Sequence, residues 1–411
     1  MDLSVIDFND IYLDNAGPQL KRYEAAIDAF ARNFGTRENI GIFSAPGRTE
    51  ICGNHTDHQH GEVLAASVNL DAIAIARTSG NNNVRVVSGN DPLITVSSLE
   101  KRGDETGTTA ALIKGVIASL KEAGYETGGF DAYITSDVLI GAGLSSSAAF
   151  ETLIGTIVSG LFNGMQIDPV TIAKAGQKAE NEFFGKPCGL MDQMACSVGN
   201  MVHIDFKDPE NPVMEKISLD LAGTGYSLCI TDTRGSHSDL THEYAAVPAE
   251  MRKVANLLGH DVLRPVTIDE ILDNMDELRT KAGDRAVLRA MHFVEENKRV
   301  GKCVQALKAG NFSGFLKEIK ASGDSSFKYL QNVYSSSDVT VQNVSVALAV
   351  SDSILSEEEC SRVHGGGFAG TIQAFVKNTN TDRYRKTMDS IFGEGSCRIL
   401  KVRKYGGIKV L

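Results

Sequence analysis

The sequence lacks the features that would mark a membrane protein. No stretch reaches the roughly 18 consecutive apolar residues that a spanning helix requires. An apolar run over residues 64–76 is interrupted by Ser67, Asn69 and Asp71. The first residues, MDLSVIDFNDIYLD, have neither a basic start nor a long apolar core, so no signal peptide is expected. A membrane span is therefore excluded at the level of sequence.

Cysteine pairs and basic charge are also missing. The seven cysteines are odd in number and include no CxxC pair, so neither a disulfide framework nor a thiolate zinc site is indicated, and a reducing cytoplasm fits best. The 41 basic residues face 52 acidic ones, giving a net charge of -11. This balance argues against a nucleic-acid or anionic-membrane partner. A phosphate site would have to be local, built from backbone amides, a helix start or a magnesium ion.

Proline is scarce, at nine residues against 40 glycines, which indicates tight backbone sites rather than a linker protein. No repeat with a period of about 20–50 residues is present. Hydrophobic periodicity predicts helices over 18–34, 108–123, 148–162, from 284 onward and late in 338–355, and strands over 41–43, 62–66, 72–76, 84–88, 130–136, 228–231, 371–376 and 397–402. We expect a hairpin turn at 81–83 and an α+β fold of two domains, 1–220 and 221–411.

The strongest local motif is GAGLSSSA over residues 141–148, directly before a predicted helix. Glycines let the backbone approach a ligand closely, and the free N–H groups and dipole of a helix start favour an anion. The motif is not a Walker A loop, because GxxxxGK[ST] and its lysine are missing. It predicts a phosphate-binding loop; a turn that only caps the helix is the alternative. The loop residues are Gly141, Ala142, Gly143, Leu144, Ser145, Ser146 and Ser147.

A second motif, APGRTEICGNHTDHQHG over residues 45–61, concentrates one arginine, two acids and three histidines after a predicted strand. This density of polar side chains suits hydrogen bonding to a polyhydroxylated ligand. A metal site formed by His55, His58 and His60 is a rival interpretation, although thiolates are missing and the spacing matches no common zinc motif. A solvated loop is a third interpretation.

Two shorter motifs follow. In CGLMDQ, residues 188–193, Asp192 stands after a Pro/Gly turn among apolar neighbours. A buried aspartate needs a partner to stay ionised, and Arg48 is a candidate; an ordinary turn acid is the alternative. The stretch RVHGGGFAG, residues 362–370, is a glycine-rich turn before a strand and is weak by itself.

In this order, the four motifs resemble those of the GHMP small-molecule kinases and, within them, the galactokinases. The second motif is similar to the galactokinase signature APGRVNLIGEHTDYNGG, and the GLSSSA loop to the family's ATP phosphate loop. CGLMDQ resembles CGIMDQ, and GGGFAG resembles the third family motif, GGGFGG. Weaker matches, among them RAMH at 289–292 against the family's RARH, extend the resemblance over nearly the whole chain.

The resemblance implies a monomeric enzyme that uses ATP and Mg2+ to phosphorylate the anomeric C1 hydroxyl of a monosaccharide, galactose above all. It implies a ribosomal S5 domain 2-like N-terminal domain and a ferredoxin-like C-terminal domain with the active site between them. By position, Asp192 would face the C1 hydroxyl as base or orienting acceptor, and Arg48 would hold it ionised. Ser147 and Glu180 would bind magnesium. The sugar would contact Asn54, His55, Asp57, Glu50 and Tyr244.

The sequence departs from the galactokinase pattern at positions that bear on the sugar. Galactokinases usually carry asparagine at the position of Glu50 and glutamate at the position of Asn54, so the two residue types are exchanged here. His58, His60 and His364 replace the usual tyrosine, glycine and threonine. In one interpretation, Glu50 partly replaces the carboxylate that is missing at position 54. In the other, the pocket for C6 of the sugar has lost a negative charge and admits the C6 carboxylate of galacturonate, because the repulsion between like charges is gone. A catalytically silent sensor of sugar and ATP, and a kinase for mevalonate or homoserine, are further alternatives.

Overall fold

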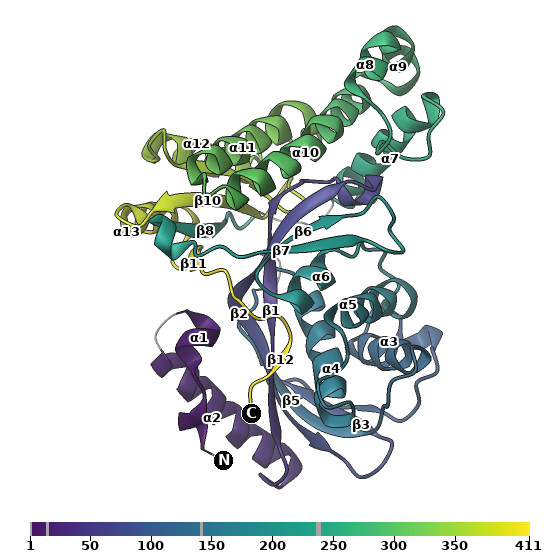
Figure 1. Ribbon diagram of the computed structural model, residues 1–411, viewed down its shortest axis with the longest axis vertical. Helices are drawn as coiled ribbons and strands as arrows, with labels where there is room; N and C mark the ends of the chain where they lie inside the picture. Colours follow the sequence, from purple (N-terminus) through teal and green to yellow (C-terminus); the bar gives the residue numbers. More distant parts are fainter. Residues whose placement is uncertain (1, 14–15, 140–142, 236–239) are drawn as a thin grey trace.

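The computed structural model describes all residues except 1, 14–15, 140–142 and 236–239. Its strands form two sheets, which confirms the predicted α+β class (Figure 1). The larger sheet has the order β12-β1-β2-β5-β3-β4, extended from β2 by β6 and β7. Its strands are β1 (Gly41–Cys52), β2 (Glu62–Thr78), β3 (Val84–Ser88), β4 (Ile94–Val96), β5 (Phe130–Ser136), β6 (Met201–Asp205), β7 (Val213–Ile217) and β12 (Ile408–Lys409). The smaller sheet has the order β11-β8-β10-β9, with β8 (Tyr226–Asp232), β9 (Cys360–His364), β10 (Thr371–Lys377) and β11 (Cys397–Leu400).

The long strand β2 replaces two shorter strands predicted at 62–66 and 72–76. That prediction is wrong because Ser67 and Asp71, which interrupt the apolar run, are both fully buried within the strand. The Ser67 hydroxyl donates to a backbone carbonyl at 2.7 Å, and Asp71 is ion-paired with Arg403 at 2.9 Å. Polar residues can occupy a buried strand when each finds such a partner.

The turn at residues 81–83 reverses the chain but does not make the predicted hairpin. β5 lies between β2 and β3, and β3 pairs with β5 in the parallel direction. The partner strand therefore comes from a later part of the chain, which the local turn residues do not specify.

Helices cover both faces of the larger sheet. Alternate residues of β2 point to opposite faces: Ile73 and Ile75 pack against α1 and α2, whereas Ala72 and Ala74 pack toward α3 and α4. The helices of this half are α1 (Phe8–Tyr12), α2 (Ala16–Phe34), α3 (Thr109–Glu122), α4 (Ser146–Phe162), α5 (Pro169–Lys178), the π-helical turn η4 (Ala179–Phe184) and α6 (Met191–Val198). Short 3-10 turns are η1 (Leu3–Val5), η2 (Asp57–Gln59), η3 (Gly103–Glu105) and η5 (Ala222–Thr224).

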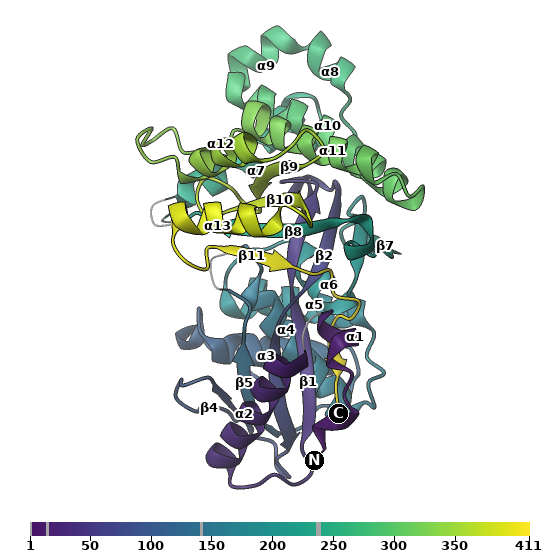
Figure 2. The same ribbon diagram turned by 90° about the vertical axis from the view of Figure 1, so that its left-hand side faces the viewer.

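The second half surrounds the smaller sheet with helices (Figure 2). α12 and α13 share a core with β8–β10, and α10 and α11 belong to the cluster that joins the two sheets. These helices are α7 (Thr241–Leu257), α8 (Ile268–Asp273), α9 (Met275–Ala282), α10 (Asp284–Lys308), α11 (Phe312–Ser325), the π-helical turn η6 (Ser326–Leu330), α12 (Asn343–Ile354) and α13 (Thr381–Phe392). Among the described helices, none combines the length and apolar character needed to traverse a bilayer.

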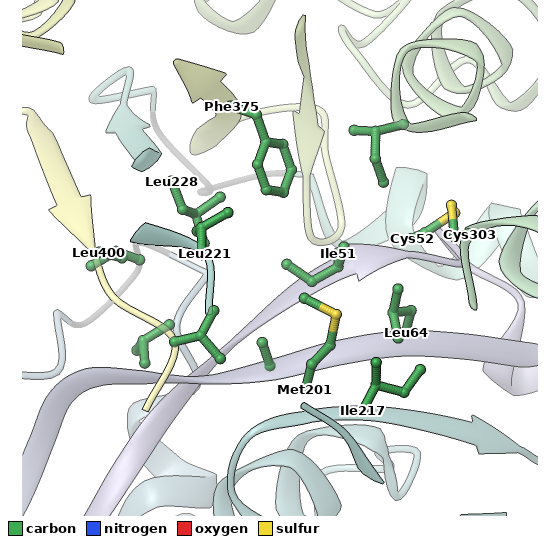
Figure 3. Close-up of a cluster of buried hydrophobic side chains, with 14 of the residues drawn as sticks. Ile51, Cys52, Leu64, Met201, Ile217, Leu221, Leu228, Cys303, Phe375 and Leu400 are labelled. Atoms are coloured by element: carbon green, nitrogen blue, oxygen red, sulfur yellow. The ribbon is translucent and has the colours of Figure 1, made fainter. Parts of the chain in front are cut away.

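A shared apolar cluster joins the two sheets (Figure 3). Ile51 and Leu64 come from the larger sheet, Leu228 and Phe375 from the smaller one, and Cys303 from α10. The last strand of the chain, β12, returns to the larger sheet and pairs with β1. The predicted boundary near residue 220 falls between β7 and β8 and stays a prediction.

Candidate active site

Arg48 and Asp192 form the ion pair at the centre of the site. Arg48 lies in β1 just after a register shift against β2, and Asp192 lies in the first turn of α6. The arginine Nε donates to Oδ1 and Nη2 donates to Oδ2, each at 2.7 Å. The partnership predicted for these two residues is present, in the bidentate geometry that makes arginine–carboxylate contacts strong.

This contact keeps the Asp192 carboxylate charged. Burial raises the pKa of Asp192, but the charge of Arg48 and hydrogen bonds from Arg48 and Ser145 lower it more, so the net shift is downward. The Asp192 side chain is nevertheless 32% exposed. It is therefore an ionised carboxylate with an open edge, suited to accept a hydrogen bond or a proton from a hydroxyl.

The predicted phosphate loop passes directly over this pair. Gly143 and Ser145 have left-handed φ angles of 69° and 53°, and a Cβ on Gly143 would come within 2.8 Å of His364 Nδ1, so this position requires glycine. Leu144 is fully buried, and its carbonyl accepts the Arg48 N–H at 3.1 Å. The loop is thus anchored to the strand that carries the arginine.

Helix α4 begins within the predicted loop, at Ser146. Its first N–H groups and the positive end of its dipole lie at this turn, as anion binding requires. Gly141 and Ala142, also predicted for the loop, lie outside the described residues. The described part of the loop therefore brings hydroxyls and a helix start to the carboxylate of Asp192.

Ser147 and Glu180 lie side by side, as a shared metal site would require. The Ser147 hydroxyl donates to Glu180 Oε1 at 3.4 Å, from α4 to the π-helical turn η4. Glu180 is 3% exposed. Hydroxyl and carboxylate oxygens are ligands that Mg2+ accepts, usually with waters and substrate phosphates completing the shell. The donor set fits magnesium, although no cluster of three or more His, Cys, Asp or Glu able to hold a metal occurs among the described residues.

A second buried acid, Glu151, lies behind Glu180 and was missed in the sequence. Gln193 Nε2 donates to Glu151 Oε2 and to Glu180 Oε2, each at 3.0 Å. Burial and then the charge of Glu180 raise the pKa of Glu151 to about 9, so it is neutral near pH 7. An acid in the otherwise apolar stripe of helix 148–162 is the sequence signal that would have found it.

His55 and Asp57 lie in the loop between β1 and β2, residues 53–61, which we call the sugar loop. His55 has a left-handed φ of 58°, and its Nε2 donates to the Gly366 carbonyl at 3.1 Å. Asp57 opens the short turn η2 and lies against Gly189, where a Cβ would approach its Oδ2 to 2.4 Å. Burial raises the pKa of Asp57, and the negative charge of Asp192 raises it further, whereas His55 lowers it; the net shift is upward. Asp57 and Asp192 are therefore close enough to influence each other's charge.

Glu50 and Asn54 make their polar contacts with other protein groups. The Glu50 carboxylate is 4% exposed and ion-paired with Arg362 at 2.8 Å. Asn54 is fully buried: its Nδ2 donates to Glu50 Oε1 at 3.1 Å and to the Gly365 carbonyl at 2.7 Å, and its Oδ1 accepts from Asn332 at 2.8 Å. Both side chains are thus engaged with protein groups beneath the glycine-rich turn.

Tyr244 packs on that same turn. Its hydroxyl donates to the Gly367 carbonyl at 2.9 Å, and its ring meets Phe368 edge-on at 5.4 Å. A Cβ on Gly366 would come within 2.8 Å of the Tyr244 ring, which explains why this turn needs glycine. The third motif therefore holds both Tyr244 and His55, through the neighbouring carbonyls of Gly367 and Gly366.

Helix α10 fixes the backbone of the sugar loop, which the sequence indicated only through His292. His292 Nε2 donates to the Asn54 carbonyl at 3.0 Å. Glu296, one turn later and fully buried, accepts the N–H groups of Gly53 at 3.1 Å and Asn54 at 3.3 Å. Burial raises the pKa of Glu296, but His292 and nearby arginines outweigh it and lower the pKa to about 2. A charged residue in the buried stripe of the helix was the available signal.

The histidines that depart from the galactokinase pattern form no metal-binding cluster among the described residues. His364 hydrogen-bonds Thr49 and Thr371, each at 2.9 Å. His58 has both ring nitrogens buried without a hydrogen-bond partner among the described residues, and burial, then His55, holds its pKa well below its usual range. His60 is partly exposed, and burial, then Arg252, lowers its pKa.

Comparisons with known proteins agree with this geometry. Residues 28–78 match the model of the galactokinase galactose-binding signature, and residues 111–200 match that of the GHMP kinase N-terminal domain. A galactokinase of Streptomyces coelicolor is 30% identical over 369 residues, covering 89% of this chain and 92% of the relative. A galactokinase of Lactobacillus helveticus is 31% identical over 384 residues, covering 91% of this chain and 93% of the relative.

Solved structures give the same result. The galactokinase of Lactococcus lactis complexed with galactose has a TM-score of 0.81 at 26% identity, covering 94% of this chain and 100% of that chain. The mevalonate kinase of Methanococcus jannaschii shares the fold, with a TM-score of 0.61 at 15% identity, covering 89% of this chain and 99% of that one. With motifs, fold and near full-length relatives in agreement, the chain belongs to the galactokinases of the GHMP kinase family.

Proposed function

We propose that this chain transfers the terminal phosphoryl group of ATP to the anomeric C1 hydroxyl of galactose. The observation that carries the proposal is the ion pair between Arg48 and Asp192, held at the foot of the phosphate loop. The galactokinase of Lactococcus lactis, whose structure contains galactose, supports the choice of sugar. Phosphoryl transfer needs positioning and charge stabilisation more than covalent help, and this site supplies both.

In this proposal, Asp192 accepts the hydrogen bond of the C1 hydroxyl and takes its proton as transfer proceeds. Arg48 keeps the carboxylate ionised and fixes its plane through two hydrogen bonds. Ser145 donates to the same carboxylate, so the loop that would bind phosphate also orients the acid. A hydroxyl bound at the open edge of Asp192 would then lie next to the phosphate loop, as a direct transfer requires.

Ser147 and Glu180 would hold magnesium, which when bound offsets the negative charge of the ATP phosphates. Glu151, neutral beside them, adds no further negative charge at pH 7. The loop from Gly143 to Ser147, with Gly141 and Ala142, would bind the phosphates through backbone N–H groups.

His55, Asp57 and Tyr244 would contact the sugar hydroxyls. We assign Glu50 and Asn54 a different role from direct contact, because their polar atoms are occupied by Arg362, Asn332 and the Gly365 carbonyl. In that role they hold the glycine-rich turn and the sugar loop together.

The proposal also includes a two-domain, monomeric enzyme of the cytoplasm, with domains 1–220 and 221–411. All seven cysteines are free thiols and six of them are buried, which supports a reducing compartment. Light scattering of the purified chain would test the monomer.

A galacturonate kinase is the second candidate. The charge of Glu50 is compensated by Arg362 and Asn54 is neutral, so the position where related enzymes carry a glutamate offers no free carboxylate to repel a uronate. ADP release from Mg·ATP should be measured with galactose, galacturonate, glucose, N-acetylgalactosamine and arabinose. Turnover with galactose supports the first proposal, and turnover only with galacturonate supports the second. No turnover in a protein that binds ATP would favour the silent sensor.

A further inference from the structure

Lys186 lies at the edge of the site, between Gly185 and Pro187. Its backbone is fixed: Gly185 has a φ of 85°, the Lys186 N–H donates to the Glu180 carbonyl at 3.0 Å, and the following proline restricts Lys186 to an extended conformation. A Cβ on Gly185 would come within 2.9 Å of the Thr106 side chain, so this turn is tightly built. The lysine side chain therefore starts from a defined position beside η4.

The ammonium group of Lys186 covers the buried carboxylate of Glu180. Nζ lies 2.8 Å from Oε1, the oxygen that also accepts from Ser147. The Lys186 side chain is 62% exposed and that of Glu180 5%. The positive charge of Lys186 also helps to lower the pKa of Asp192. It therefore lies on the solvent side of both acids that the phosphoryl transfer would use.

We propose that Lys186 binds the terminal phosphate oxygens of ATP, exchanging its contact with Glu180 for the nucleotide. The inference rests on the proposed use of ATP. The phosphate loop contains no lysine, and Arg48 is committed to Asp192. Magnesium at Ser147 and Glu180 would compete for Oε1, and the displaced ammonium, on a flexible four-carbon stem, would meet the incoming phosphates as a mobile point charge.

The competing explanation is that Lys186 only neutralises Glu180. The two explanations differ in the size of the effect. A simple counterion competes with the metal, so its removal would strengthen magnesium binding, and the uncompensated charge of Glu180 would weaken metal-free nucleotide binding only by a modest, salt-screened repulsion. A phosphate ligand contributes a direct contact even without metal, so its removal would weaken nucleotide binding strongly.

The test is calorimetric titration of ATP into the full chain in EDTA, without sugar, comparing wild type, Lys186→Met and Lys186→Arg. Lys178→Met is the matched control, because Lys178 forms a similar ion pair with Glu122 at 2.5 Å, with its side chain 36% exposed. We expect Lys186→Met to weaken ATP binding by about tenfold or more, as for one lost charge-assisted contact. Lys186→Arg should stay within about threefold, because it keeps the charge, and the control should match wild type.

ATP binding by Lys186→Met that is tighter than wild type, or weaker by less than about threefold, would overturn the role of Lys186 while leaving the kinase proposal intact. If the wild type binds no ATP in EDTA or in magnesium, both proposals fail. Thermal unfolding of each variant checks the fold, which a side chain as exposed as Lys186 should not determine.

Discussion

Replacing Glu296 by glutamine should loosen the sugar loop. The Glu296 carboxylate accepts the N–H groups of Gly53 and Asn54 and pairs with Arg299 at 2.6 Å. Glutamine keeps the shape but removes the charge, and its amide group brings a donor where donors already converge. Because the side chain is fully buried, water does not replace the lost partner.

The magnitude follows from two independent considerations. Removing one partner of a buried ion pair costs about 3–5 kcal/mol, and the Arg299 side chain is only 14% exposed. The lowering of the Glu296 pKa from 4.5 to about 2 corresponds to at most about 3 kcal/mol of stability above pH 4.5, because His292, whose charge is the first cause of the lowering, has a pKa lowered to about 4 and is neutral at pH 7. We therefore expect Glu296→Gln to reduce the free energy of unfolding by about 3 kcal/mol, and to raise KM for the sugar by about tenfold while KM for ATP stays within about twofold.

Urea unfolding at pH 7 and steady-state kinetics measure the two effects. Glu295→Gln is the matched control, because Glu295 lies on the same helix but is 42% exposed and pairs with Lys298 on the surface; it should cost less than about 1 kcal/mol. The pKa is lowered in the folded state, so this stability is lost as pH falls from 4.5 toward 2, and the variant should not show that loss. A cost below about 1 kcal/mol together with an unchanged sugar KM would refute the reasoning.

Two further substitutions test the chemistry directly. Asp192→Asn should lower kcat by about 100-fold or more, the range for losing a positioned proton acceptor, while ATP and galactose binding measured by calorimetry stay largely intact; near-normal turnover would mean that another group accepts the proton. Ser147→Ala should raise the magnesium concentration needed for half-maximal activity if this hydroxyl is a ligand; an identical magnesium titration would remove Ser147 from the metal site.

Local patterns predicted the helices α2, α3, α4, α10 and α12 and several strands of both sheets, but not other helices such as α7 and α11. The helix expected from residue 284 begins there, and the strands over 84–88 and 130–136 agree with β3 and β5. The two wrong predictions for the larger sheet, the break in β2 and the hairpin at 81–83, came from long-range contacts. β2 continues through Asp71 only because Arg22 and Arg403, from opposite ends of the chain, pair with it. No local pattern around Asp71 contains that information.

The same distinction applies to the site. The meeting of Arg48 and Asp192 was expected, because a buried acid after a tight turn needs a cation. The ion pair of Glu50 with Arg362 spans 312 positions of the chain and could not be predicted from spacing. Glu296 and Lys186 were missed for a related reason: each acquires its importance from a tertiary neighbour, not from its own surroundings in sequence.

The most direct test of the central claim is the position of the phosphate on the product. The chain should be incubated with Mg·ATP and galactose, and the product examined by phosphorus NMR with coupling to the sugar protons. We predict one new phosphorus signal coupled to the anomeric proton, with ADP formed in equal amount. A signal coupled to the C6 protons, or free phosphate with unchanged galactose, would contradict the placement of the C1 hydroxyl at Asp192.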